Sequence, residues 1–341
     1  MDNRLPILTL PANALKNVLL AMNFQHVLTL SLVSKRTHSL ISKNWLRPPY
    51  GSRLSFEPHY VSLRVWFAGR KTTIDFYPIS GDGQSSLENT EHFEFAVDEP
   101  RTRYRTLELS GIAVTKCIQK FIGILNMELV EELTISSSCT PETTPATNIS
   151  KFLERIPYER FVMYEEHGDF TRSIFQLLSP PEQYQIYNYP AVKPGYQQKV
   201  IMESSQCLMF KRSAALAISF DDLLSMNSDY IDLEWSALPD KCINRYLKLW
   251  IKGCHRRLES LQISVSEEDI GLREVDAALV MRGIHHQMIP GEREFPISYA
   301  YRRGLYTITI TDGMDIVRYD GKATATICIQ GSVLQMVVTH H

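Results

Sequence analysis

The sequence predicts an α/β protein in which a small helical N-terminal module precedes a larger part built of alternating strands and helices. Three observations support this fold class. The 341 residues exceed one ordinary hydrophobic core and suit one small and one large part. The first 47 residues have helical periodicity, whereas later residues alternate strand patterns with amphipathic helices. With 44 % hydrophobic and 22 % charged residues, the composition is that of a globular chain.

The N-terminal module is predicted to contain three helices. Pro11 can open the first helix, because its missing N–H costs nothing there, and an apolar stripe at helical spacing begins at Leu15. The run from Phe24 to Val33 is apolar almost all round, which predicts a buried second helix. Ser34 is expected to cap a third helix that ends near Trp45.

Three helices in about 40 residues form a marginal core by themselves. Two interpretations therefore stay open: a module that docks on another protein, or a helical cap on the domain that follows. Pro48 and Pro49 break the chain after the module, as a domain linker would.

The middle of the chain repeats a strand followed by a helix. Leu107, Leu133 and Phe161 lie in successive strand patterns, 26 and 28 residues apart, and the alternation returns between residues 230 and 265. A strand–helix unit of 20–29 residues is typical of leucine-rich repeats. We therefore predict a leucine-rich-repeat-like βα solenoid over residues 106–300. The alternative is an α/β domain without repeats.

The two flanks of this region predict antiparallel strands. Residues 50–105 alternate apolar and polar side chains in several runs. Residues 301–338 contain two Asp-Gly pairs, Asp312-Gly313 and Asp320-Gly321, which we expect to form turns between hairpin strands. A β-hairpin cap over 301–338 would close the open end of the solenoid.

Bulk properties exclude several classes of protein. A net charge of −2 and a pI of about 6.6 give no general basic surface, so neither a nucleic acid nor a membrane is expected as a partner. The N-terminus lacks a signal-peptide pattern, and no stretch reaches the ~20 apolar residues of a membrane span. The six cysteines form no C-x-x-C pair and are expected to be reduced. The protein is therefore expected inside the cell, in the cytoplasm, the nucleus or both.

No motif for catalysis, cofactor binding or metal binding is found. Phosphate-binding loops and nucleophile elbows are absent, and the spacing of Cys254-His255 and His285-His286 fits no zinc site. Asp221-Asp222 suits the first turn of a helix, and the basic run 252–257 suits a helix end. We expect no enzyme, no cofactor and no metal. The alternative is an enzyme whose site forms only in three dimensions.

The N-terminal segment resembles an F-box. The marks are the Leu-Pro near the start, the aliphatic first helix and the ending LTLSLVSKRTHSLI, which together span Leu5 to about Asn44 and set a module over residues 4–47. The resemblance implies binding to the Skp1 adaptor and, through it, to a cullin. It departs from the family at Gln25-His26, where an acidic residue is often found. The residues that the resemblance implies for Skp1 binding are Leu10, Pro11, Leu15, Leu19, Leu28, Leu30 and Val33.

A second resemblance covers residues 216–329. The segments NRYLKLWIKGCHRRLESLQISV and RYDGKATATICI are similar to the type-2 F-box-associated domain (FBA_2) of an expanded nematode family. That domain is thought to recognise substrates, and it implies no catalytic residue.

Together these observations predict a substrate-recognition adaptor of an SCF-type cullin–RING ubiquitin ligase, with Skp1 and an unidentified client protein as partners. A protein-interaction module independent of any ligase is the alternative. Solenoid sheets bind partners on exposed strand residues, which lie beside the buried leucines. The expected client-binding residues are Glu108, Thr134, Asp232, Glu234 and Gln262.

Overall fold

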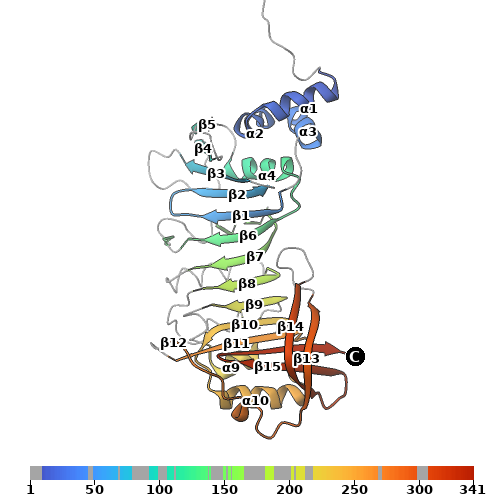
Figure 1. Ribbon diagram of the computed structural model, residues 1–341. Helices are drawn as coiled ribbons and strands as arrows, with labels where there is room; N and C mark the ends of the chain where they lie inside the picture. Colours follow the sequence, from blue (N-terminus) through green and yellow to red (C-terminus); the bar gives the residue numbers. More distant parts are fainter. Residues whose placement is uncertain are drawn as a thin grey trace, which may run out of the picture. The chain divides into compact units, whose positions relative to one another are not determined.

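The computed structural model describes most of the chain in segments (Figure 1). They are residues 10–44, 49–67, 70–78, 92–98, 106–110, 113–136, 138–139, 149–150, 153–154, 156–164, 181–187, 201–202, 205–211, 218–267, 271–297 and 306–341. The sequence pattern also predicts a helix from about residue 169 to 178, which lies outside these segments. The chain divides into two compact units, one comprising Met1–Glu159 with Gln176–Leu178 and the other Arg160–Phe175 with Ser179–His341.

The first unit begins with the three predicted helices, α1 (Ala12–Ala21), α2 (Phe24–Val33) and α3 (Lys35–Asn44). Asn23 caps α2, because its side chain accepts a hydrogen bond of 2.8 Å from the His26 amide. At the start of α3 the Ser34 hydroxyl accepts from the Thr37 amide at 3.1 Å, and the Thr37 hydroxyl accepts from the Ser34 amide at 3.0 Å. The predicted Ser34 cap is therefore confirmed.

Six strands form the sheet of the first unit. They are β1 (Gly51–Phe56), β2 (Val61–Phe67), β3 (Arg70–Pro78), β4 (His92–Asp98), β5 (Thr106–Ser110) and β6 (Val130–Ile135). Their order is β5-β4-β3-β2-β1-β6. Strands β1 to β4 pair antiparallel, as the sequence predicts for residues 50–105. Strand β5, expected to be the first strand of the parallel solenoid, pairs antiparallel with β4, and β6 pairs parallel with β1.

Helix α4 (Val114–Ile124) carries the chain from one edge of this sheet to the other. Its Phe121 ring lies 5.9 Å from Phe76 of β3 and 5.8 Å from Phe95 of β4, measured between ring centroids, and all three side chains are fully buried. The prediction that the strands of Leu107 and Leu133 are consecutive repeat neighbours is therefore wrong. Four antiparallel strands separate them, and a spacing of 26 residues cannot reveal that crossover.

Within this unit, the N-terminal helices pack on the sheet and on α4 through α2 and α3. Phe24 of α2 meets Phe67 of β2 edge to face, with 6.0 Å between ring centroids. His38 of α3 lies against Gly123 of α4, where an added Cβ would come within 3.4 Å of the imidazole. Burial, with a smaller contribution from Lys120, lowers the pKa of His38. The marginal helical core is thus completed by the neighbouring domain, as the cap interpretation expects.

Five parallel strands in chain order begin the second unit. They are β7 (Tyr158–Met163), β8 (Gln183–Ile186), β9 (Cys207–Phe210), β10 (Tyr230–Ser236) and β11 (Ser260–Glu267). The sequence patterns predict β7, β10 and β11, and a further strand near Tyr184 to Tyr187 that corresponds to β8. Strand β9 is missed. Described helices of this unit are α9 (Phe220–Ser225), α10 (Asp240–Ile251) and α11 (Ala277–Val280), and the two-residue strand β12 (Gly271–Leu272) pairs with β11.

The C-terminal strands continue this sheet beyond β11 in antiparallel order. They are β13 (Gln287–Ile297), β14 (Tyr306–Val317), β15 (Ala323–Gln330) and β16 (Val333–His340), with β16 against β11. Asp320-Gly321 forms the predicted turn, where the Gly321 amide donates to the Arg318 carbonyl at 2.9 Å. The second predicted turn is wrong, because Asp312-Gly313 lies inside β14.

The Asp312-Gly313 pair forms an irregular bend within a continuous strand. Asp312 has a φ of 52°, the register of β13 against β14 shifts between Ile289 and Glu292, and the Asp312 carboxylate accepts from the Gly291 amide at 2.9 Å. An Asp-Gly pair supplies the unusual backbone that both a turn and a β-bulge require, so the pattern alone cannot separate the two.

Beyond this bend, the outer half of the β13–β14 hairpin packs onto β9 and β10 (Figure 1). Phe295 and Ile308 lie against a buried cluster that includes Ile310 and Met209. The other members of the cluster are Cys207, Tyr230, Cys328 and Val337. The hairpin therefore covers part of one face of β9 and β10.

Candidate protein-interaction surfaces

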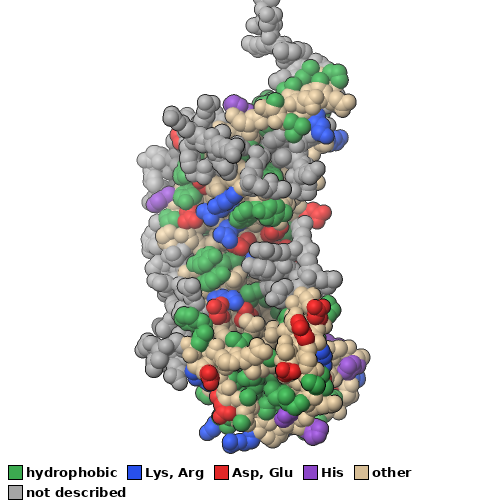
Figure 2. Space-filling view, viewed as in Figure 1, with side chains coloured by type: hydrophobic (Ala, Val, Ile, Leu, Met, Phe, Trp, Pro, Cys, Tyr) green, Lys and Arg blue, Asp and Glu red, His purple; other side chains and the backbone are tan. Residues whose placement is uncertain are grey.

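The N-terminal helices expose apolar side chains to solvent. Val33 is 72 % exposed and Pro11 is also exposed, whereas Leu10 and Leu30 are half-buried. Leu20 is a further exposed apolar residue, with 58 % of its surface exposed. The sequence did not predict it, because it lies outside the apolar stripe of α1. Figure 2 shows hydrophobic side chains on the surface over these helices. Exposed apolar groups gathered on a small module are typical of a protein contact.

Three of the seven residues expected at the Skp1 surface lie instead in the module's core. Leu19 and Leu28 are fully buried, and Leu15 is 4 % exposed. Their side chains hold the helices together and cannot reach a partner. They serve binding only by positioning the exposed apolar side chains.

A second candidate surface lies on β10 and β11 of the second unit. Asp232 stands opposite Gln262 in the parallel register, and Glu234 follows on the same side of β10. The ammonium group of Lys211 lies 2.5 Å from Asp232 Oδ2 and 3.2 Å from Glu234 Oε2. The structure therefore brings together three of the five residues expected to bind a client, with a lysine that the sequence did not point to.

Charge pairing dominates this cluster. Burial raises the pKa of Asp232, and Lys211 opposes that rise. Burial alone would lower the pKa of Lys211, but Asp232 and Glu234 outweigh it and raise that pKa. Two carboxylates and one ammonium leave a net negative charge, and the Glu234 side chain is 41 % exposed.

The other two expected client-binding residues belong to the first unit. Thr134 of β6 is 6 % exposed, and its hydroxyl donates to Glu132 Oε1 at 3.2 Å, so the expectation that it is exposed is wrong. Glu132 also pairs with Arg53 of β1 at 2.5 Å, which closes this part of the sheet face. Glu108 stands opposite Glu94 in the β4–β5 register, and its side chain lies outside the described atoms.

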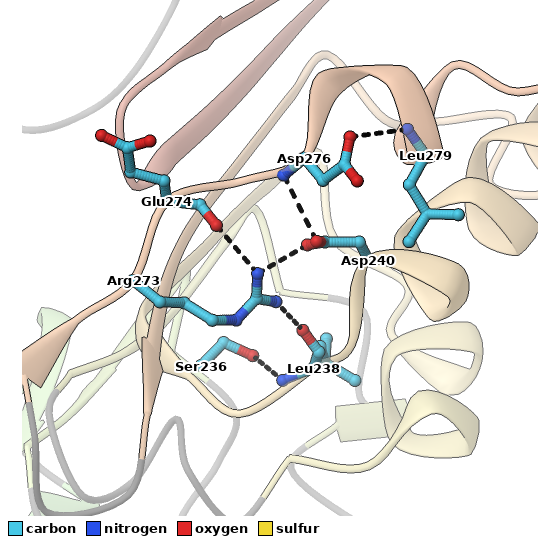
Figure 3. Close-up of polar contacts among 7 residues, drawn as sticks. All are labelled: Ser236, Leu238, Asp240, Arg273, Glu274, Asp276 and Leu279. Atoms are coloured by element: carbon cyan, nitrogen blue, oxygen red, sulfur yellow. Dashed lines mark hydrogen bonds and ion pairs between the residues drawn. The ribbon is translucent and has the colours of Figure 1, made fainter.

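Figure 3 shows an arginine that ties the start of α10 to the loop before α11. Arg273 Nη1 donates to Asp240 Oδ1 at 2.8 Å, and Nη2 donates to the Leu238 carbonyl at 2.9 Å. Asp240 Oδ2 accepts from the Asp276 amide at 3.3 Å, and Asp276 in turn caps α11 through the Leu279 amide. A pocket of about 640 Å³ borders Arg273 and Asp240. Because both carboxylate oxygens of Asp240 have partners, this network is structural.

The groups singled out for possible chemistry also have structural partners. Asp222 forms a capping box with Ser219 at the start of α9, as a first-turn acid is expected to do. His255 lies 3.0 Å from the Leu224 carbonyl and 3.2 Å from the Tyr246 hydroxyl, and burial lowers its pKa. His286 Nδ1 lies 2.9 Å from the Ile284 carbonyl. Within the described segments, no group of three or more potential ligands could hold a metal ion.

Two family models match the chain. The first, described as F-box domain, matches residues 7–48, and the second, described as F-box associated, matches residues 196–263. The chain carries an F-box and an F-box-associated segment. No curated protein and no solved structure matches it. Among the described helices, none is long and apolar enough to cross a membrane.

The F-box match covers α1 to α3, and the F-box-associated match covers β9, α9, β10, α10 and the first part of β11. The Lys211–Asp232–Glu234 cluster lies inside the second match, and strands β13 to β16 lie outside it. An F-box with an F-box-associated segment marks an adaptor-type protein rather than an enzyme. F-boxes generally bind Skp1 within SCF complexes.

Proposed function

We propose that this chain is the substrate-recognition adaptor of an SCF-type cullin–RING ubiquitin ligase. Its F-box binds Skp1, and its second unit holds a client protein so that ubiquitin is transferred by proximity. The observation that carries the proposal is the set of exposed apolar side chains, led by Leu20 and Val33, on helices that match the F-box model.

The proposed Skp1 surface consists of Leu10, Pro11, Leu20, Leu30 and Val33. Burying an exposed leucine or valine side chain stabilises a complex by roughly 1.5–3 kcal/mol at a well-packed interface. An aspartate at the same place would bring an unpaired charge into that interface. The buried Leu15, Leu19 and Leu28 support this surface from beneath.

The test is capture of purified Skp1 by the full-length chain, with the variant Val33→Asp. Val33 is 72 % exposed, so folding tolerates the change, and binding is expected to fall at least tenfold. Ser39→Asp on the exposed surface of α3 is the matched control, because it adds the same charge at a polar position. Wild-type protein that fails to capture Skp1 would refute the adaptor proposal.

Of the repeat region expected over 106–300, we propose that the part from β7 to β11 is leucine-rich-repeat-like, and we propose a hairpin cap over 301–338. The parallel strands β7 to β11 in chain order support the first, and the antiparallel strands β13 to β16 support the second. Asp232, Glu234 and Gln262 are the proposed client contacts, since they lie on one face of two paired strands and the Glu234 side chain is 41 % exposed. Their net negative charge favours a basic segment of the client.

One observation favours the alternative of an interaction module independent of the ligase. Gln25 and His26 occupy the place of a frequent acidic residue, and Gln25 is 7 % exposed. Any contact that the acidic residue makes in F-boxes that contain it would be absent from this chain. The capture experiment separates the two functions directly, because only the adaptor binds Skp1.

A further inference from the structure

An exposed tryptophan with an unusual backbone conformation lies near the end of β10. Trp235 has a φ of 69°, in the left-handed region that bulky residues rarely adopt, and it is 40 % exposed. Backbone strain of this kind persists only where the surrounding structure holds it, and it is concentrated at binding sites. The packing of the core does not require a large side chain at this exposed position.

A β-bulge turns this tryptophan outward. The register of β10 against β11 shifts between Leu233 and Ser236, so that Glu234 and Trp235 together stand opposite one residue of β11. Leu233 and Ser236 are both fully buried. In a regular strand Trp235 would lie on the buried side with Leu233, because successive side chains alternate between the two faces. The extra residue therefore exposes two successive side chains, one acidic and one aromatic.

Two hydroxyl groups hold the chain on either side of the bulge. The Trp235 amide donates to the Ser264 hydroxyl of β11 at 2.9 Å. The Leu238 amide donates to the Ser236 hydroxyl at 3.2 Å (Figure 3). Because these hydrogen bonds fix the backbone before and after the strained residue, Trp235 is held ready for a partner rather than free to turn away.

The bulge also carries an excess of negative charge. Among the described residues, the cation that pairs with Asp232 and Glu234 is Lys211, at 2.5 Å from the first carboxylate and 3.2 Å from the second. One ammonium group balances only one of these two carboxylates. The Glu234 side chain is the more open of the two, 41 % exposed against 23 % for Asp232. A cation from solvent can therefore reach Glu234 at the surface.

An exposed tryptophan next to an exposed carboxylate suits an arginine side chain. The face of an indole ring attracts cations, and the planar guanidinium group stacks on it. The same guanidinium can donate two parallel hydrogen bonds to a carboxylate, which gives the contact a fixed geometry. A lysine ammonium group is compact and strongly hydrated, and it stacks on no ring. The combination therefore favours arginine over lysine, which net charge alone would not do.

An apolar side chain continues this surface on β12. Leu272 stands opposite Ser266 of β11 and is 56 % exposed. Opposed residues of antiparallel strands project to the same face, and Ser264, two residues before Ser266, projects to that face as well. Since the Ser264 hydroxyl contacts the bulge, Leu272 and Trp235 border one surface. An aliphatic residue beside the bound arginine would cover Leu272.

We propose that Glu234 and Trp235 bind an arginine side chain of the client protein, with an aliphatic neighbour of that arginine on Leu272. The inference rests on the proposed adaptor function and deepens it, because it narrows the basic segment of the client to arginine and adds Trp235 to the contacts. Glu234 and Trp235 lie within the F-box-associated match, whereas Leu272 lies beyond it.

The test is fluorescence anisotropy with the full-length chain and the peptide Gly-Ser-Gly-Arg-Leu-Gly-Ser, labelled with an uncharged dye. The same peptide with lysine in place of arginine is expected to bind about threefold more weakly, and with uncharged citrulline about fivefold or more. Equal affinity for the arginine and citrulline peptides would overturn the proposal, and so would undetectable binding of the arginine peptide. Competition by agmatine, which has a guanidinium group but no peptide chain, as strong as by the unlabelled peptide would overturn the assignment to a peptide.

The variant Glu234→Gln is expected to weaken binding of the arginine peptide about fivefold. Its matched control is Glu292→Gln, which removes the same charge from an exposed position of β13 and should change the affinity less than about 1.5-fold. Equal losses in the two variants would refute the site and indicate general electrostatic attraction.

The variant Trp235→Asn separates binding from packing. Asparagine tolerates the left-handed region, so the urea midpoint of the variant is expected to stay the same or rise, while the arginine peptide binds about fivefold more weakly. A lower urea midpoint with unchanged peptide affinity would overturn the role of Trp235, because the ring would then serve only packing.

Skp1 capture by the same protein separates this inference from the proposed function. Failure of arginine-peptide binding with Skp1 capture intact refutes the arginine site alone. Failure of Skp1 capture with arginine-peptide binding intact refutes the adaptor role and leaves an arginine-binding interaction module.

Discussion

The second unit contains two arginine–aspartate ion pairs that differ in how deeply they are buried. We expect burial to decide how much each pair contributes to the stability of the fold. The side chains of Arg273 and Asp240 are 20 % and 10 % exposed, whereas those of Arg257 and Asp229 are 48 % and 20 % exposed. Arg273 also donates to the Leu238 and Glu274 carbonyls. Replacing it by glutamine leaves Asp240 and two carbonyls without their cationic partner.

The expected magnitude follows from that difference. Removing one partner of a buried ion pair destabilises by roughly 3–5 kcal/mol, and the partial exposure of Arg273 places Arg273→Gln near about 3 kcal/mol. At ~2–4 °C per kcal/mol for a unit of this size, the melting temperature should fall by about 6–12 °C. Arg257→Gln should cost about 1 kcal/mol or less, because exposed pairs are weak.

The assay is urea unfolding of the full chain, followed by circular dichroism, for both variants and the wild type. The double variant Arg273→Gln/Asp240→Asn should recover part of the loss, because it removes the unpaired charge. If Arg257→Gln destabilises as much as Arg273→Gln, burial does not govern these pairs and the reasoning is wrong.

Two further predictions concern other parts of the molecule. Burial would raise the pKa of Asp315, but hydrogen bonds from Arg293 and Thr326 outweigh it and hold that pKa below its ordinary value. The ionised Asp315 side chain therefore contributes its full stabilisation above its ordinary pKa, and this stabilisation is lost as the pH falls through the lowered pKa. The difference in urea midpoint between the wild type and Asp315→Asn should accordingly shrink on acidification. Phe121→Ala should destabilise the first unit by about 3–5 kcal/mol in urea unfolding, because it opens a cavity under α4. A loss below ~1 kcal/mol would instead show that the helix can move onto the sheet and fill the cavity.

The elements with strong local signals could be predicted from the sequence. Apolar periodicity and caps identify α1 to α3, α4 and α10, because each buries one stripe on a neighbour. The missed strand β9 has four residues, all buried, so it shows no alternation from which to recognise a strand. Arg273 was missed for another reason. It lies 33 residues from Asp240, and no local pattern reports a contact between them.

The errors have a common physical origin in long-range pairing. Leu107 and Leu133 have the spacing of repeat neighbours, yet the strands that contain them lie at opposite edges of the first unit's sheet. Thr134 alternates with buried residues and was expected on an open face, but its neighbours Glu132 and Arg53 close that face. The sequence predicted some of the exposed apolar residues of the F-box but also named leucines that are buried. A single sequence does not distinguish leucines of the core from leucines of the surface.

The late arrival of β6 has a consequence for synthesis on the ribosome. Strand β1 spans residues 51–56, and its parallel partner β6 spans residues 130–135. At ~5–20 residues per second, β1 waits roughly 4–16 s with one edge unpaired while β2 to β5 and α4 are made. Unpaired edges invite association with other nascent chains. Chaperone contact during this interval is therefore expected to concentrate on the N-terminal half, before α4 has brought β6 into place.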